Sequence, residues 1–162
     1  KVYLFSESPW LGGMLTAAGV SAIDGNHQLP SGLWGEFRTK LYAHYGGPEA
    51  LAIGWVSNTH FEPKVGDSIL KSMVQYPNLK IYYNTKINRI LQTHKGWKIS
   101  YVSKDKLAHI EGAILIDGTE NGDVLPLVGA EFNVGMDAQS DTGEKEAPKN
   151  SNKIVDARLA QM

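Results

Sequence analysis

The hydrophobic positions form two kinds of pattern along the chain. Residues 1–5 are a continuous, mostly apolar run followed by the polar turn at 6–9, a pattern typical of a buried parallel strand. Farther on, apolar residues recur at helical spacing and predict a helix that ends at Gly46-Gly47-Pro48. The residues with this spacing are Leu33, Trp34, Phe37, Leu41 and Tyr42. A second helix is predicted from Pro63 to about Tyr76, because proline suits the first helical position and an apolar stripe follows it.

The section from Leu79 to Asp117 is predicted to be rich in strands. Five short apolar or β-branched runs are separated by turn residues: Ile81–Tyr83, Ile87–Leu91, Trp97–Val102, Leu107–Ile110 and Ala113–Ile116. The order of strand, helices, strand, antiparallel meander and strand indicates an α/β fold with a parallel sheet. From Gly135 the chain becomes polar, so we expect a domain over 1–134 and a polar extension or tail over 135–162.

Composition narrows the classes of function. The 162 residues contain 16 Lys and Arg against 17 Asp and Glu, without the basic excess that is usual in nucleic-acid-binding proteins. Apolar runs such as 112–116 are far shorter than the roughly 18 residues of a membrane span. We therefore expect a soluble protein, cytoplasmic or periplasmic, that binds neither nucleic acid nor membranes. No cysteine is present, which excludes thiolate catalysis and cysteine zinc sites.

Several residues are candidates for binding or chemistry, and each has a simpler interpretation. Glu7 follows the first strand, where an acidic residue accepts hydrogen bonds from ribose hydroxyls in dinucleotide-binding folds, or it is a solvated loop residue. Gly12 and Gly13 allow close approach of a phosphate or a flat ring, or form a tight turn. The loop 117–123 follows the last predicted strand, where open α/β sheets bind ligands, or it is a polar turn before a short helix.

A possible proton-transfer pair lies just before the second helix. His60 and Glu62 are close in sequence and are the least weak candidates for catalysis, although His60 also fits a capping or surface role. The other histidines are scattered, and no pair has the spacing of a helical zinc site. The sequence contains no Walker-type loop, no complete nucleophile elbow and no Gly-x-Gly-x-x-Gly fingerprint.

Together these segments resemble the FAD-dependent oxidoreductase family, within the flavoproteins that have two dinucleotide-binding folds. The similarity extends to bacterial members described as xanthan-lyase-associated. It covers most of residues 1–148, and its order and spacing are more specific than any one motif. The segments that carry it are Glu7, 10–16, 19–25, 60–63, 115–123 and 127–144.

The resemblance implies a partial Rossmann-like FAD/NAD(P)-binding domain with a parallel sheet and an inserted antiparallel β-meander. It places Glu7 at the adenosine ribose. It also places the start of the strand at Thr85-Lys86-Ile87 near the adenine, which the backbone of Ile87 would contact. Gly12 and Gly13 would lie near the pyrophosphate and ribityl chain, with Met14 and Leu15 toward the flavin. Gly118 and Thr119 match the loop that closes over the cofactor.

The implied function is FAD-dependent transfer of hydride between a small-molecule substrate and flavin. The family's glycine-rich first strand and helix, and its C-terminal part, have no counterpart in this sequence, so we expect a fragment or a truncated form. A second chain or another segment would then complete the sheet, or Val2–Phe5 and Ala113–Ile116 would pair directly. In that topology Ile81–Tyr83 pairs in parallel with Val2–Phe5. The alternatives are a module without cofactor that has a structural or interaction role, and a module that holds adenosine without redox chemistry.

Overall fold

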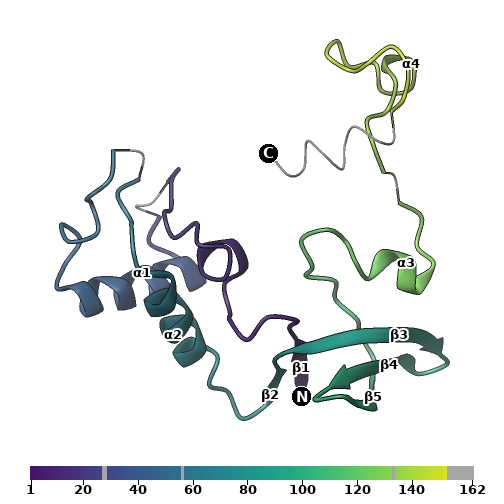
Figure 1. Cartoon of the computed structure of the whole chain (residues 1–162), viewed down its shortest axis with the longest axis horizontal. Coiled ribbons are helices and arrows are strands. Elements are labelled where there is room, and N and C mark those ends of the chain that lie inside the picture. Colours follow the sequence, from purple (N-terminus) through teal and green to yellow (C-terminus); the bar gives the residue numbers. More distant parts are fainter. Residues whose placement is uncertain (27–28, 56, 133, 153–162) are drawn as a thin grey trace. The chain divides into compact units, whose positions relative to one another are not determined.

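The computed structural model describes residues 1–26, 29–55, 57–132 and 134–152 (Figure 1). The chain divides into two compact units. The first unit comprises Lys1–Arg89 and Lys98–Glu111. The second comprises Ile90–Trp97 and the described residues from Gly112 onward. The division into 1–134 and 135–162 made from the sequence stays a prediction.

A two-stranded parallel sheet lies in the first unit. Strands β1 (Val2–Phe5) and β2 (Leu79–Tyr82) pair in parallel, in a register that sets Val2 opposite Leu79 and Phe5 opposite Tyr82. The pairing continues one step beyond the strands, because the Ser6 amide donates to the Tyr82 carbonyl at 2.9 Å. The predicted parallel pairing of these two segments is confirmed.

Two helices occupy the long connection between β1 and β2. Helix α1 spans Gly32–Tyr45 and ends at Gly46, which has a left-handed backbone. Helix α2 spans Pro63–Met73, with proline in its first turn as the sequence predicted. A short 3-10 helix, η1 (Gly13–Leu15), precedes them.

The helices enclose the main hydrophobic core of the first unit. Leu41 and Leu51 are fully buried, and the rings of Phe37 and Phe61 meet edge to face at 5.5 Å between centroids. Met73 completes this buried cluster. Leu33, predicted on the same face of α1, is instead 73% exposed because it lies in the first turn, before the residues that reach the core.

The predicted meander forms a three-stranded antiparallel sheet in the order β3-β4-β5. Its strands are Thr85–Thr93, Gly96–Ser103 and Lys106–Gly112. The tight turn between β4 and β5 has positive φ at Lys104 (51°) and Asp105 (60°), the two-residue geometry that suits the twist of a hairpin. Tyr101 of β4 is buried, and its ring lies 5.0 Å from that of Phe5 in β1, so the meander packs against the parallel pair.

The predicted strand Ala113–Ile116 is wrong. The structure gives these residues no strand, and Ile114 and Ile116 are 80% and 83% exposed. A strand requires a hydrogen-bonded neighbour, and in the described part of the chain this segment has none. Direct pairing with Val2–Phe5 is therefore also wrong.

The rest of the second unit contains short elements. Helix α3 spans Leu125–Val128, in agreement with the alternative that the loop 117–123 is a polar turn before a short helix. Helix α4 spans Gln139–Thr142. An antiparallel bridge joins Met136 to Asn152, so the polar region folds back on itself. Among the described residues, we find no helix with the length and apolar character required to cross a bilayer.

Candidate cofactor site

The position of Glu7 is set by hydrogen bonds on both sides of it. Ser6 continues the parallel pairing, and its carbonyl accepts from the Thr85 amide at 3.0 Å. The Ser6 hydroxyl donates to the Ser8 carbonyl at 3.0 Å, and the Ser8 hydroxyl accepts from the Trp10 amide at the same distance. Glu7 is thus held at the carboxyl end of β1, the edge at which parallel sheets bind ligands.

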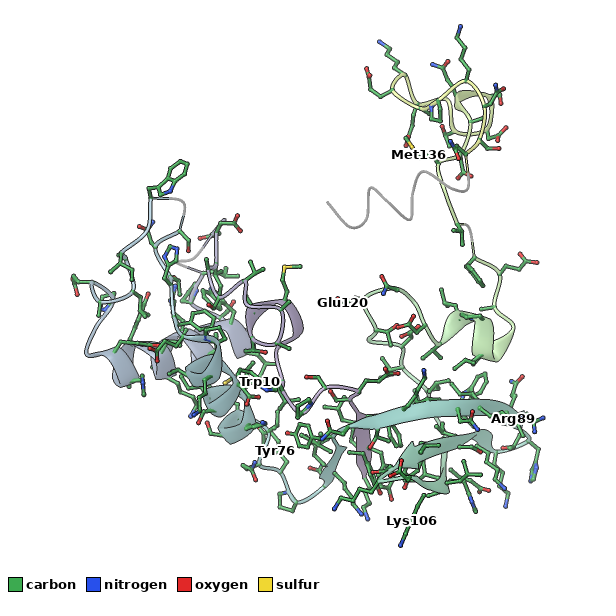
Figure 2. The ribbon with its side chains drawn as sticks, viewed as in Figure 1. Trp10, Tyr76, Arg89, Lys106, Glu120 and Met136 are labelled. Atoms are coloured by element: carbon green, nitrogen blue, oxygen red, sulfur yellow. The ribbon has the colours of Figure 1, made fainter. Side chains whose placement is uncertain are left out.

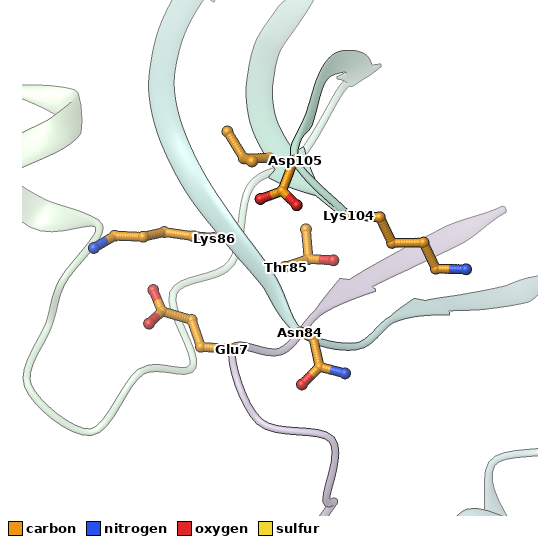
Figure 3. Close-up of a pocket in the computed structure, with 7 residues that line it drawn as sticks. Glu7, Asn84, Thr85, Lys86, Lys104 and Asp105 are labelled. Atoms are coloured by element: carbon orange, nitrogen blue, oxygen red, sulfur yellow. The ribbon is translucent and has the colours of Figure 1, made fainter.

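Glu7 lines a cavity of about 390 Å³, which falls within the usual range of roughly 300–1,000 Å³ for ligand pockets. Every lining residue belongs to the first unit. Figure 3 shows Glu7 and Lys86 extending to one side of β3 and Lys104 to the other. The lining residues are Glu7, Asn84, Thr85, Lys86, Val102, Lys104 and Asp105.

The walls of this cavity come from three places in the chain. Asn84 and Thr85 lie where β2 leads into β3; Asn84 has a left-handed backbone, and the buried Thr85 hydroxyl donates to the Tyr83 carbonyl at 2.8 Å. Lys104 and Asp105 form the β4–β5 turn. Two acidic and two basic residues are therefore among the lining residues of one cavity, and their side chains include donors and acceptors suited to hydroxyl groups and anionic oxygens.

The resemblance to flavoproteins placed Ile87 at the adenine. In the structure Ile87 lies in β3, directly after two residues that line the cavity, Thr85 and Lys86. Sequence reasoning missed Asn84, Lys104 and Asp105 as lining residues. The turn at 103–106 was predicted, but its position beside Glu7 depends on tertiary packing.

The glycine-rich segment lies outside the set of cavity-lining residues. Gly12 caps η1, and Gly13 begins it. Met14 is 59% exposed, while Leu15 packs against the helical core. Contacts of these four residues with a cofactor stay a prediction.

Gly118 and Thr119 lie in the second unit, in a loop organised by Asp117. One oxygen of Asp117 accepts from the Thr119 amide at 2.9 Å and from its hydroxyl at 2.7 Å. The other oxygen accepts from the Val124 amide at 3.2 Å. The hydrogen bond from the Thr119 amide holds the pKa of Asp117 below its ordinary value of 3.8, and the hydrogen bond from the Thr119 hydroxyl lowers it further.

This lowered pKa predicts how the loop responds to acid. The hydrogen bonds contribute stability above the unfolded-state pKa, and that contribution is lost as the pH falls through the lower pKa of the folded state. In an NMR titration we expect the Asp117 carboxyl and the Thr119 amide to shift together, with a midpoint below 3.8. Thr119→Val should move the midpoint upward, because it removes the hydroxyl and keeps the amide. A wild-type midpoint at or above 3.8 would contradict this loop geometry.

His60 and Glu62 lie apart from the Glu7 cavity lining. The His60 ring packs directly against Gly54, and its Nδ1 is buried with no hydrogen-bond partner among the described residues. Glu62 is exposed, and its backbone amide donates to the Tyr45 hydroxyl at 2.9 Å. A catalytic role for either residue stays a prediction.

Comparison with known proteins decides the family. The sequence model of the FAD dependent oxidoreductase family matches residues 1–161. The chain belongs to this family. The family implies a bound FAD and an oxidoreductase, and the parallel pair with its helices and meander is consistent with part of a Rossmann-like α/β domain. No curated protein and no solved structure matches the chain significantly.

The chemistry of the cavity residues in this FAD-dependent oxidoreductase chain is compatible with one end of the cofactor that the family implies. A carboxylate at the carboxyl end of a parallel strand can accept hydrogen bonds from adjacent ribose hydroxyls, and Glu7 is an acidic residue at that position in the cavity lining. Lys86 extends to the same side of β3 as Glu7, and its positive charge there suits the anionic character of a dinucleotide (Figure 3). In the described residues, there is no group of three or more His, Cys, Asp or Glu that would hold a metal ion.

Proposed function

We propose that the Glu7 cavity binds the adenosine end of FAD in an oxidoreductase that transfers hydride between a small-molecule substrate and the flavin. The observation that carries this proposal is the position of Glu7, on a cavity wall at the carboxyl end of β1 in a confirmed parallel pair. FAD, when bound, accepts or donates the hydride through its isoalloxazine ring. The residues of this chain bind and orient the cofactor, with Glu7 at the ribose hydroxyls.

The proposal also requires donors for the pyrophosphate. The usual source is a Gly-x-Gly-x-x-Gly loop between a strand and a helix, and these 162 residues do not contain that motif. Among the described residues β2 is the only strand paired with β1, which leaves the other edge of β1 available. We infer that a strand from another segment or a second chain pairs there and brings the phosphate-binding loop.

The first test is the identity of the cofactor in the natural full-length protein. We expect the purified protein to show a flavin absorbance spectrum that bleaches on reduction, and to release FAD rather than FMN on denaturation. Release of an adenine nucleotide without flavin would favour the module that holds adenosine without redox chemistry. A protein that neither contains nor binds any nucleotide would favour the structural module.

The second test is Glu7→Ala in the same protein. A hydrogen bond to a charged group contributes roughly 1.5–3 kcal/mol, and about 1.4 kcal/mol corresponds to a tenfold change in affinity. We therefore expect the Kd for FAD, measured by flavin fluorescence, to rise about 10- to 150-fold. Glu49→Ala, at an exposed position outside the cavity lining, is the matched control and should leave the Kd unchanged. An unchanged Kd in Glu7→Ala would make Glu7 a solvated loop residue.

A further inference from the structure

Helix α2 presents an ion pair whose contacts extend beyond the helix. Asp67 and Lys71 lie one turn apart, and the Lys71 Nζ is 2.7 Å from Oδ2 of Asp67. Asp67 is 8% exposed, which is unusual for a carboxylate at a helix surface. A buried charge is stable only when it is paired and hydrogen-bonded, so the remaining partners of this pair identify what it holds.

Those partners are backbone groups of the segment between Glu7 and Gly12. The Leu11 amide donates to Oδ1 of Asp67 at 2.8 Å. The Lys71 ammonium donates to the Pro9 carbonyl at 2.8 Å. The helix therefore holds the chain on both sides of Trp10, through one donor and one acceptor of the backbone.

Lys71 also contacts the residue that precedes a second lining segment of the cavity. Its Nζ lies 5.3 Å from the ring centroid of Tyr83, within the range of a cation–π contact. Tyr83 immediately precedes Asn84, and Pro9 follows Glu7 by two residues; Asn84 and Glu7 both line the cavity. One ammonium group thus connects the segments that carry two walls of the same site.

From these contacts we propose that Asp67 and Lys71 are positioning residues for the cofactor. They fix the path from Glu7 to the Gly12-Gly13 turn before FAD binds, so that binding does not have to order this segment. The proposal rests on the proposed function, because it assumes that Glu7 and the glycine turn face the same ligand. Neither side chain is required to touch FAD.

The two variants of Asp67 separate positioning from general stability. Asp67→Ala removes the acceptor of the Leu11 amide, whereas Asp67→Asn retains an oxygen at that position. In the natural full-length protein we expect Asp67→Ala to raise the Kd for FAD at least about tenfold, and Asp67→Asn to restore it to within about threefold of wild type. Hydrogen exchange of the Leu11 amide should follow the same order, fast in Asp67→Ala and slow in wild type and Asp67→Asn.

A second ion pair with the same spacing serves as the control. Glu36 and Lys40 lie one turn apart on α1, and the Lys40 Nζ is 3.8 Å from Oε1 of Glu36. Both side chains are exposed. Lys40→Met should change neither the Kd for FAD nor exchange at Leu11. If Asp67→Ala fails to fold, Lys71→Met provides the test, because Lys71 is partly exposed and its loss removes the Pro9 anchor. We expect it to raise the Kd several-fold.

The outcomes distinguish this proposal from the proposed function. A wild-type protein that binds no FAD overturns both. FAD binding that is equally tight in wild type, Asp67→Ala and Lys71→Met overturns only the positioning role. The same conclusion follows if Asp67→Ala lowers the melting temperature without changing the Kd, or if Asp67→Asn binds as weakly as Asp67→Ala.

Discussion

Leu41→Ala is expected to destabilise the first unit by about 2–5 kcal/mol. Leu41 is fully buried on α1, within the cluster that also contains Phe37, Leu51 and Phe61. Figure 2 draws the side chains of the chain as sticks, in the same view as Figure 1. Truncation removes buried methyl groups and leaves a cavity that rigid aromatic neighbours fill only in part. Urea unfolding of wild type and variant, followed by circular dichroism, measures the difference in the free energy of unfolding.

Leu33→Ala is the matched control, because the same substitution is made on the same helix. Leu33 is 73% exposed, so its truncation should change the free energy of unfolding by no more than about 0.5 kcal/mol. The difference between the two variants measures the burial of one face of α1. Equal losses at both positions would show that α1 packs through a different face.

The elements that the sequence predicted correctly are those whose signals are local. Pro63 and the apolar stripe after it specify the start and the buried face of α2 within a few residues. The hairpin turns of the meander are also local, since their polar residues interrupt runs of β-forming residues. Tertiary packing shifts only the boundaries of such elements.

The strand predicted at Ala113–Ile116 shows where local reasoning stops. Its residues are apolar and β-forming, but a strand exists only if another backbone pairs with it. Whether such a neighbour is present is not encoded in these four residues. The same limit explains why the positions of Lys104 and Asp105 beside Glu7 could not be predicted.

Asp67 and Lys71 are an intermediate case. Their i, i+4 spacing on a predicted helix indicates an ion pair, which is usually worth little at a surface. Only the structure shows that the carboxylate is buried and bonded to the Leu11 amide, more than fifty residues away in sequence. Sequence reasoning did not single out this pair; its spacing is typical of an ion pair, and packing determines what the pair holds.

Gly12→Ala is expected to destabilise the protein by about 2–5 kcal/mol, for two reasons that add. Gly12 has φ of 107°, a conformation that costs an L-residue about 1–2 kcal/mol. An added Cβ would also lie 2.6 Å from Cδ1 of Leu70 and 2.8 Å from Cγ2 of Thr16. Overpacking of this kind costs about 1–3 kcal/mol, because the neighbours must leave their preferred rotamers. Thermal and urea unfolding measure the sum.

Gly19→Ala separates the two contributions to the Gly12 effect. Gly19 also has a positive φ, 76°, but an added Cβ would meet no atom within 4 Å, so only the backbone cost of about 1–2 kcal/mol is expected. In a Leu70→Ala background the Gly12→Ala penalty should shrink, since the closest clashing atom is gone. If Gly12→Ala leaves stability unchanged but abolishes FAD binding, the glycine is required by the cofactor and not by Leu70. If it lowers stability and folded protein still binds FAD normally, packing against α2 is the reason for glycine at this position.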